Sequence, residues 1–244
     1  MDIIIVLDAG HGGKDRWNIG PTGYVEADGA LDITLKTGKI LNLYPQIKVL
    51  YTRTTDTNLY WENSQRRDLY SRAKFANDNK ADYFVSIHSN AAQSVSAHGT
   101  ETLCLAKGGQ AEKLAKSIQT EAIKKLGLTD RGVKEKSIAV LRTTNMPAAL
   151  IEVAFHSNPK EEVLLKQESF RQEAAEAIAS GILKFLNIEE IPIDKNTVRI
   201  QLKNGTIING ILKDEVSYAP VRELAEGLGY KVGWIDEKKL VTIN

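Results

Sequence analysis

The sequence predicts an α/β protein, in which a sheet carries helices on both faces, followed by a small α+β domain at the C-terminus. Three observations support this prediction. The apolar run at 3–7 (IIIVL) is typical of a buried strand in a parallel sheet. Strand-like and helix-like segments alternate from there to Asn187. Beyond Asn187, short strand-like segments surround one short helix, and a length of 244 residues suits one medium domain with a small addition.

Each element of the large domain is predicted from its own pattern. The strands are short apolar runs such as KVLYT and YFVSIH, and the helices place apolar residues at helical spacing. The last helix, for example, has Phe170, Ala174 and Ala177 on one face. The predicted strands are 3–8, 48–52, 83–88, 99–105 and 149–155, and the predicted helices are 27–43, 64–77, 109–126 and 170–186.

The pattern of predicted segments changes after the charged, proline-terminated stretch 188–192, which has the composition of a linker. VRIQL and TIINGIL flank an Asn-Gly turn at 204–205 and predict a hairpin. A helix at 220–228 and a second hairpin from KVGWI and LVTIN follow, and a unit this small has a thin core. We expect a large domain over 1–187, a linker over 188–194 and the small domain over 195–244.

The composition excludes several classes of function. Lys plus Arg is 32 against 31 for Asp plus Glu, and this net charge of +1 gives no case for a nucleic-acid binder or a polybasic membrane patch. Cys104 is the single cysteine, which excludes a disulfide scaffold and any multi-cysteine metal site. No segment approaches the ~18 apolar residues of a membrane helix, so we expect no membrane insertion.

The N-terminus bears on where the protein is made. Secretory signals have a basic start, a long apolar run and a small-residue cleavage site. Here an acidic start, Met1-Asp2, is followed by an apolar run of five residues that is better explained as the first strand. We therefore expect a protein made in the cytoplasm without a conventional signal peptide.

Two of the four histidines occupy the positions that ligand-binding residues take in α/β sheets. His11 follows the first strand and His88 ends the 83–88 strand, and the carboxyl ends of such strands form the ligand crevice. Two imidazoles and a carboxylate are a common ligand set for catalytic zinc. The candidate carboxylate is Glu26, although its position alone favours a charge at a helix N-terminus. His98 is expected in a solvated loop, and His156 is better explained as a turn residue than as a ligand.

Glu152 is an acid within the otherwise apolar strand ALIEVAF. A buried carboxylate costs several kcal/mol unless it is paired or coordinated. Glu152 is therefore either salt-bridged or faces a polar cleft at the end of the strand. Beside a metal ion it could take a proton from water and pass it to a leaving group. We favour this catalytic interpretation because perturbed acids cluster at functional sites.

Several motifs in one order resemble the zinc-dependent N-acetylmuramoyl-L-alanine amidases. They are DAGHGG at 8–13, Glu26, SIHSN at 86–90 and ALIEVAFHSNP at 149–159, with TRTTDTN, RRDLYSRAKFAN and DRGVKE between them. The resemblance spans about residues 1–187 and implies a twisted, mostly parallel sheet flanked by helices. It also implies that zinc (Zn²⁺) is held by His11, Glu26 and His88, and that Glu152 is the catalytic glutamate.

The resemblance further implies the reaction. The family cleaves the amide between N-acetylmuramic acid and L-alanine, the first residue of the stem peptide, so bacterial peptidoglycan is the expected partner. Two alternatives remain open from the sequence: a zinc peptidase or carboxypeptidase on wall peptides, and a non-catalytic wall-binding protein. Without a signal peptide, a phage endolysin released through a holin fits best, and a sporulation mother-cell lytic enzyme comes second.

The tail, about residues 195–244, resembles the small domain at the N-terminus of copper amine oxidases. YAPVRELA at 218–225, VGW at 232–234 and VTI at 241–243 carry this resemblance. It implies no copper here, because the tail has no His, Cys or Met. A cell-wall targeting module and a spacer are the two roles expected for it.

Overall fold

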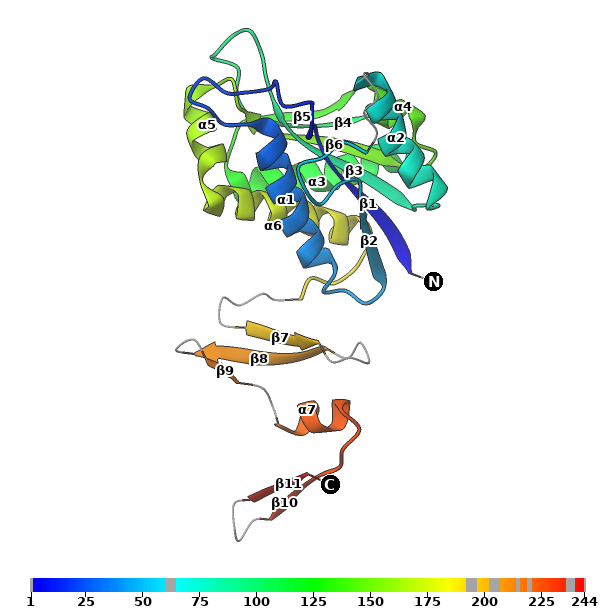
Figure 1. Ribbon diagram of the computed structural model, residues 1–244, viewed down its shortest axis with the longest axis vertical. Helices are drawn as coiled ribbons and strands as arrows, with labels where there is room; N and C mark the ends of the chain where they lie inside the picture. The colour runs from blue at the N-terminus through cyan, green and yellow to red at the C-terminus, as the bar shows by residue number, and fades with distance from the viewer. Residues whose placement is uncertain are drawn as a thin grey trace. The chain divides into compact units, whose positions relative to one another are not determined.

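The computed structural model describes residues 2–59, 65–191, 197–201, 207–213, 216–218, 221–235 and 240–243. The chain divides into two compact units, Met1–Glu190 and Ile191–Asn244 (Figure 1). The predicted boundaries at 187 and 194 remain predictions, since residues 192–194 lie outside the described part. Within that part, we find no helix with the length and apolar character that crossing a bilayer needs.

A single mixed sheet organises the first unit and confirms the predicted α/β class. The order across the sheet is β2 (Ile47–Tyr51), β1 (Ile3–Ala9), β3 (Tyr83–Asn90), β6 (Ala148–Phe155), β4 (Thr100–Cys104) and β5 (Asp130–Glu135). Neighbouring strands β2, β1, β3 and β6 are all parallel, whereas β4 runs antiparallel to β6 and parallel to β5.

Helices cover both faces of this sheet, as predicted (Figure 1). On one face α1 contacts β1 and β3, α3 contacts β4, β5 and β6, and α6 packs against both helices. On the other face α2 and the short α4 pack together, and α4 contacts β6. The helices are α1 (Glu26–Leu41), α2 (Gln65–Asp78), α3 (Gln110–Leu126), α4 (Ala139–Thr143), α5 (Pro159–Lys166) and α6 (Glu168–Phe185).

The sheet face under α2 and α4 changes from apolar to polar along the strands. Val6, Phe84 and Ala148 pair across three neighbouring strands and belong to a core that includes Val140 and Leu141 of α4. Residues two positions apart on a strand share a face. Moving toward the carboxyl ends of β3 and β6, the same face therefore presents the aligned residues His88 and Glu152. A polar site thus lies beside a conventional apolar core.

Three elements of the first unit were not predicted. Strand β5 is a charged edge strand with the sequence DRGVKE, and so lacks an apolar run. Helix α4 has only five residues, too few for a periodic pattern. Helix α5 did have a sequence signal: the Asn158 side chain accepts from the N–H groups of Lys160 and Glu161, and Pro159 is the first helical residue.

The second unit has the α+β composition predicted for the tail. Strand β8 pairs antiparallel with β7 and β9, and β10 forms a hairpin with β11. Strand β9 was not predicted, and the expected turn at 204–205 lies outside the described residues. The elements are β7 (Thr197–Gln201), β8 (Ile207–Lys213), β9 (Val216–Tyr218), α7 (Val221–Gly227), β10 (Val232–Ile235) and β11 (Leu240–Ile243).

Candidate metal centre

The loop after β1 presents His11 in an unusual backbone conformation. His11 has a φ of +58°, a left-handed value that is uncommon outside glycine. Such strain concentrates at functional sites. The preceding Gly10 permits a close approach, because a Cβ there would lie 2.3 Å from Cε1 of the His88 ring. Only glycine therefore lets the two imidazoles approach as they do, with ring centroids 5.0 Å apart.

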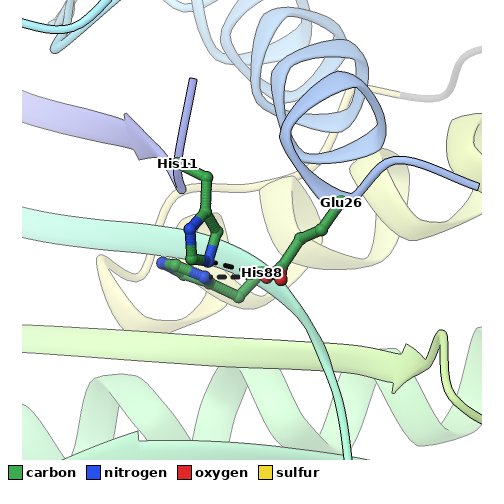
Figure 2. Close-up of side chains that lie close together, drawn as sticks. All are labelled: His11, Glu26 and His88. Atoms are coloured by element: carbon green, nitrogen blue, oxygen red, sulfur yellow. Dashed lines mark hydrogen bonds and ion pairs between the residues drawn. The ribbon is translucent and has the colours of Figure 1, made fainter. Parts of the chain in front are cut away.

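Figure 2 shows His11, Glu26 and His88 pointing toward one another from the β1 loop, the start of α1 and the end of β3. Glu26 Oε2 lies 3.3 Å from His11 Nε2, and Glu26 Oε1 lies 3.0 Å from His88 Nδ1. One donor atom from each of the three residues lies within 4.8 Å of the others. The structure thus brings together the three residues that the sequence analysis named as ligands.

Neighbouring polar groups orient these three side chains. Asp15 Oδ2 lies 3.0 Å from His11 Nδ1, which leaves Nε2 directed at Glu26. Asn18 Nδ2 donates to Glu26 Oε2 at 2.9 Å, and the backbone N–H of Ser89 donates to Oε1 at 3.1 Å. Carboxylates and backbone groups commonly fix metal-binding side chains in this way. Asp15 and Asn18 were not predicted as site residues, although both lie within seven residues of His11.

The electrostatics of the three residues favour a bound cation. Burial would raise the pKa of Glu26, but the hydrogen bonds and positive charge of His11 and His88 outweigh it and hold the pKa well below its usual range. Burial would lower the pKa of His11, yet hydrogen bonds to Asp15 and Glu26 raise it to about 10. Without a metal, a proton on His11 therefore balances the ionised carboxylates, and a metal cation can replace that proton.

Glu152 lies in the pocket beside these residues. It pairs in register with His88 on β3 and with Glu101 on β4, so the three side chains point to one face of the sheet. A pocket of about 270 Å³ is lined by Glu152, His11 and His88. The side chain is half-buried, and its Oε2 is a buried atom with no hydrogen-bond partner among the described residues. Burial and the charges of Glu26 and Glu101 raise the pKa of Glu152 well above its usual range.

Two buried arginines hold the backbone that carries the site. Arg53 donates to the carbonyl oxygens of Ala9, Gly10 and Ala27 at 2.7–3.0 Å. It therefore ties the end of β1 to the residue that follows Glu26. Arg72 donates to the carbonyl oxygen of His11 at 2.7 Å. Both arginines lie in motifs of the sequence, TRTTDTN and RRDLYSRAKFAN, but neither was predicted to have a role.

The two remaining histidines differ from each other. His98 is exposed, as expected for a solvated loop residue, and its Nδ1 lies 2.8 Å from the carbonyl oxygen of Ser96. His156 lies in a turn, as predicted, but its ring is buried. Its Nδ1 is 3.0 Å from Ser89 Oγ and 3.9 Å from Glu26 Oε2. No local pattern in the sequence predicts that the His156 ring is buried beside the Glu26 carboxylate.

Comparison with known proteins identifies the family. The family model described as N-acetylmuramoyl-L-alanine amidase, of the amidase-3 type, matches residues 5–184. The chain belongs to this family. The endolysin of Bacillus phage SPP1 is 38% identical over 194 residues, which are 78% of this chain and 68% of the endolysin. The germination-specific N-acetylmuramoyl-L-alanine amidase of Bacillus subtilis (strain 168) is 35% identical, covering 75% of this chain and 79% of that protein.

Solved structures agree with this assignment. The catalytic domain of CwlV, an N-acetylmuramoyl-L-alanine amidase from Bacillus (Paenibacillus) polymyxa var. colistinus, has a TM-score of 0.70 and 37% identity, covering 78% of this chain and all of that domain. The protein is thus a peptidoglycan amidase. This finding disfavours the two alternatives that the sequence left open, a zinc peptidase or carboxypeptidase and a non-catalytic wall-binding protein. The family match ends at residue 184 and does not extend to the second unit.

Replacing Arg53 tests how firmly the site backbone is held. Arg53→Lys keeps the charge but cannot reproduce the guanidinium hydrogen bonds to Ala9, Gly10 and Ala27. Because three buried carbonyl groups would each lose one donor, although that of Ala9 would keep a second one from Arg72, we expect the free energy of unfolding to fall by about 2–4 kcal/mol in denaturant titrations. The control Arg142→Lys changes an exposed arginine and should cost less than about 0.5 kcal/mol. Equal losses in the two variants would contradict this role.

Proposed function

We propose that this amidase is zinc-dependent and cleaves the amide between N-acetylmuramic acid and L-alanine. One observation carries the proposal: two imidazoles and a carboxylate converge within 4.8 Å beside Glu152, whose Oε2 has no hydrogen-bond partner in the part of the chain that the structure describes. Two neutral imidazoles and one carboxylate form a ligand set that catalytic zinc uses, with one coordination position left for water or substrate. His11, Glu26 and His88 are the residues that would hold the ion.

The division of labour follows from the positions of the groups. A zinc ion bound there would polarise the amide carbonyl and lower the pKa of water toward ~7. Glu152 would accept the proton as water oxygen forms its bond to the carbonyl carbon. It would then deliver that proton to the amide nitrogen as the carbon–nitrogen bond breaks, which releases the muramic acid carboxylate and the amine of L-alanine.

The environment of Glu152 suits both halves of this proton transfer. Burial and the neighbouring carboxylates raise its pKa, so the protonated form is stable enough to act as an acid. A nearby cation lowers the same pKa and favours the carboxylate that acts as a base. The two opposing effects bring the group toward a pKa useful near neutral pH.

We also propose that the cellular outcome is wall degradation and lysis, with the endolysin relative as the support for this role. Holin-dependent release from the cytoplasm would fit such a role. The germination-specific relative supports an alternative setting in spore development. Digesting purified walls and identifying the fragments by mass tests the bond that is cleaved, because an amidase exposes new N-terminal alanine and a carboxypeptidase releases free amino acids.

Metal content is the first prediction of this proposal. We expect one zinc per chain by elemental analysis, loss of activity in EDTA and recovery on adding zinc. His11→Ala should lose the metal because it removes one of three ligands. His98→Ala should keep both metal and activity, since His98 is exposed in a loop. Full activity in protein with zinc far below one equivalent would overturn the zinc assignment.

The role of Glu152 is tested by an isosteric change. Glu152→Gln should keep the fold and bind zinc, but should lower kcat on soluble muropeptides by ~100-fold or more, because the amide cannot relay a proton. Measured zinc content separates the two possible causes of a loss. If the variant turns over substrate like the wild type, or if its activity falls only in step with its zinc content, the assigned role is wrong.

For the second unit, we propose a cell-wall targeting role, with a spacer as the alternative. A chain ending at Glu190, where the first compact unit ends, should fold and cleave soluble muropeptides at close to the full-length rate. It should sediment less with purified walls and cleave them more slowly, because tethering raises the local concentration of the catalytic domain. Unchanged sedimentation would make the tail a spacer, and an insoluble product would show that the tail completes the fold of the first unit.

A further inference from the structure

The motif DRGVKE forms strand β5 at the edge of the sheet, and the proposed mechanism gives it no role. The face of the sheet that carries the site nevertheless continues to this strand. His88, Glu152 and Glu101 are aligned in register across β3, β6 and β4. Lys134 of β5 reaches the last of these, with its Nζ 2.5 Å from Glu101 Oε2. A row of charged side chains therefore runs from the candidate metal centre to the edge strand.

Positive charge exceeds negative charge at the end of this row. Glu101 is a buried carboxylate that accepts from Arg131 Nε at 2.6 Å as well as from Lys134. Arg131 is committed to the fold, because it also donates to the carbonyl oxygen of His98 and lies 4.8 Å from the ring centre of Phe155. Two cations on one carboxylate leave a surplus positive charge. The Lys134 side chain is 42% exposed, so part of it is accessible to solvent although its ammonium group is paired with Glu101.

Lys136 adds a second ammonium group. Lys136 is the residue after β5, and its backbone N–H donates to the carbonyl oxygen of Cys104 at 2.9 Å, a bond of the last pair between β4 and β5. Continued one residue past the end of the strand, the alternation puts Lys136 on the same face as Lys134, with their Cα atoms about 6.6 Å apart. Within the described part of the chain, its Nζ makes no ion pair. Lys136 lies two residues before Ile138, which lines the pocket beside Glu152.

We propose that Lys134 and Lys136 form a subsite for a carboxylate of the stem peptide, on the side of Glu152 away from His88. The inference rests on the proposed function, since it assigns the peptide part of the substrate to one side of the pocket. Two strand spacings, about 10 Å, separate β6 from β5. Lys134 pairs with Leu103, two residues along β4 from the Glu101 that pairs with Glu152, so the lysine backbone also lies about 7 Å or more along the strands from Glu152. An extended peptide covers ~3.4 Å per residue and the long lysine side chains span part of the remaining distance, so a carboxylate two or three residues from the cleaved amide comes within reach of the ammonium groups.

Two soluble substrates separate substrate binding from a structural role of the lysines. They are muramoyl dipeptides that start with L-alanine and differ only in a carboxylate or a carboxamide on the second residue. We expect Lys136→Gln to raise KM for the carboxylate substrate by about tenfold, the change that 1.4 kcal/mol produces, with kcat within twofold. KM for the carboxamide substrate should stay within twofold. Lys134→Gln should change the two KM values in the same way as Lys136→Gln. The control Lys124→Gln replaces an exposed lysine on α3 and should alter KM for neither substrate.

Each of the other outcomes overturns the inference. If KM rises equally for both substrates, the two lysines do not bind the carboxylate. The same holds if KM rises for neither substrate in both lysine variants. A fall in kcat with unchanged KM assigns them to the chemistry instead. If the wild type cleaves neither substrate but releases fragments from whole walls, the proposed carboxylate subsite is wrong, whereas the proposed amidase activity stands. If it cleaves neither substrate and no wall, the proposed function itself fails.

Discussion

The site depends on two buried guanidinium groups, which hold the backbone segments that carry it. Arg53 joins the carbonyl oxygens at the end of β1 to that of Ala27, next to Glu26, and Arg72 binds the carbonyl oxygen of His11. Burying two like charges is costly, and burial and the charge of Arg72 lower the pKa of Arg53 to about 10. Asp8 and Asp68 compensate, each pairing with Arg72 at 2.8–2.9 Å. With its backbone fixed in this way, the strained His11 keeps its left-handed conformation.

The sheet supplies the second constraint, because it sets which side chains share a face. Pairing of β3 with β6 and of β6 with β4 aligns His88, Glu152 and Glu101. The helices α2 and α4 cover the apolar part of this face and leave the polar end to the pocket. Oε2 of Glu152, which has no hydrogen-bond partner among the described residues, is tolerated there because the carboxylate lines the pocket rather than the core. The same topology places the edge strand β5 next to β4, two strands from β6.

The sequence predicted the features that a single segment encodes. His11 was found because it follows an apolar strand, His88 because it ends one, and Glu152 because an acid interrupts one. Glu26 could not be assigned from position alone, since a glutamate at a helix start is common, and the family resemblance decided it. The roles of Arg53 and His156 depend on contacts between segments far apart in the chain. Charged β5 and the five-residue α4 lack the periodicity that reveals longer elements.

The central claim is that His11, Glu26 and His88 hold one catalytic zinc ion. Crystals of the purified protein, measured on both sides of the zinc absorption edge, test it directly. We expect one anomalous peak per chain, enclosed by the His11 and His88 imidazoles and the Glu26 carboxylate, with Glu152 beside it and not among the ligands. A peak that excludes Glu26, a peak held by Glu152, or active protein with no peak at this place would contradict the account.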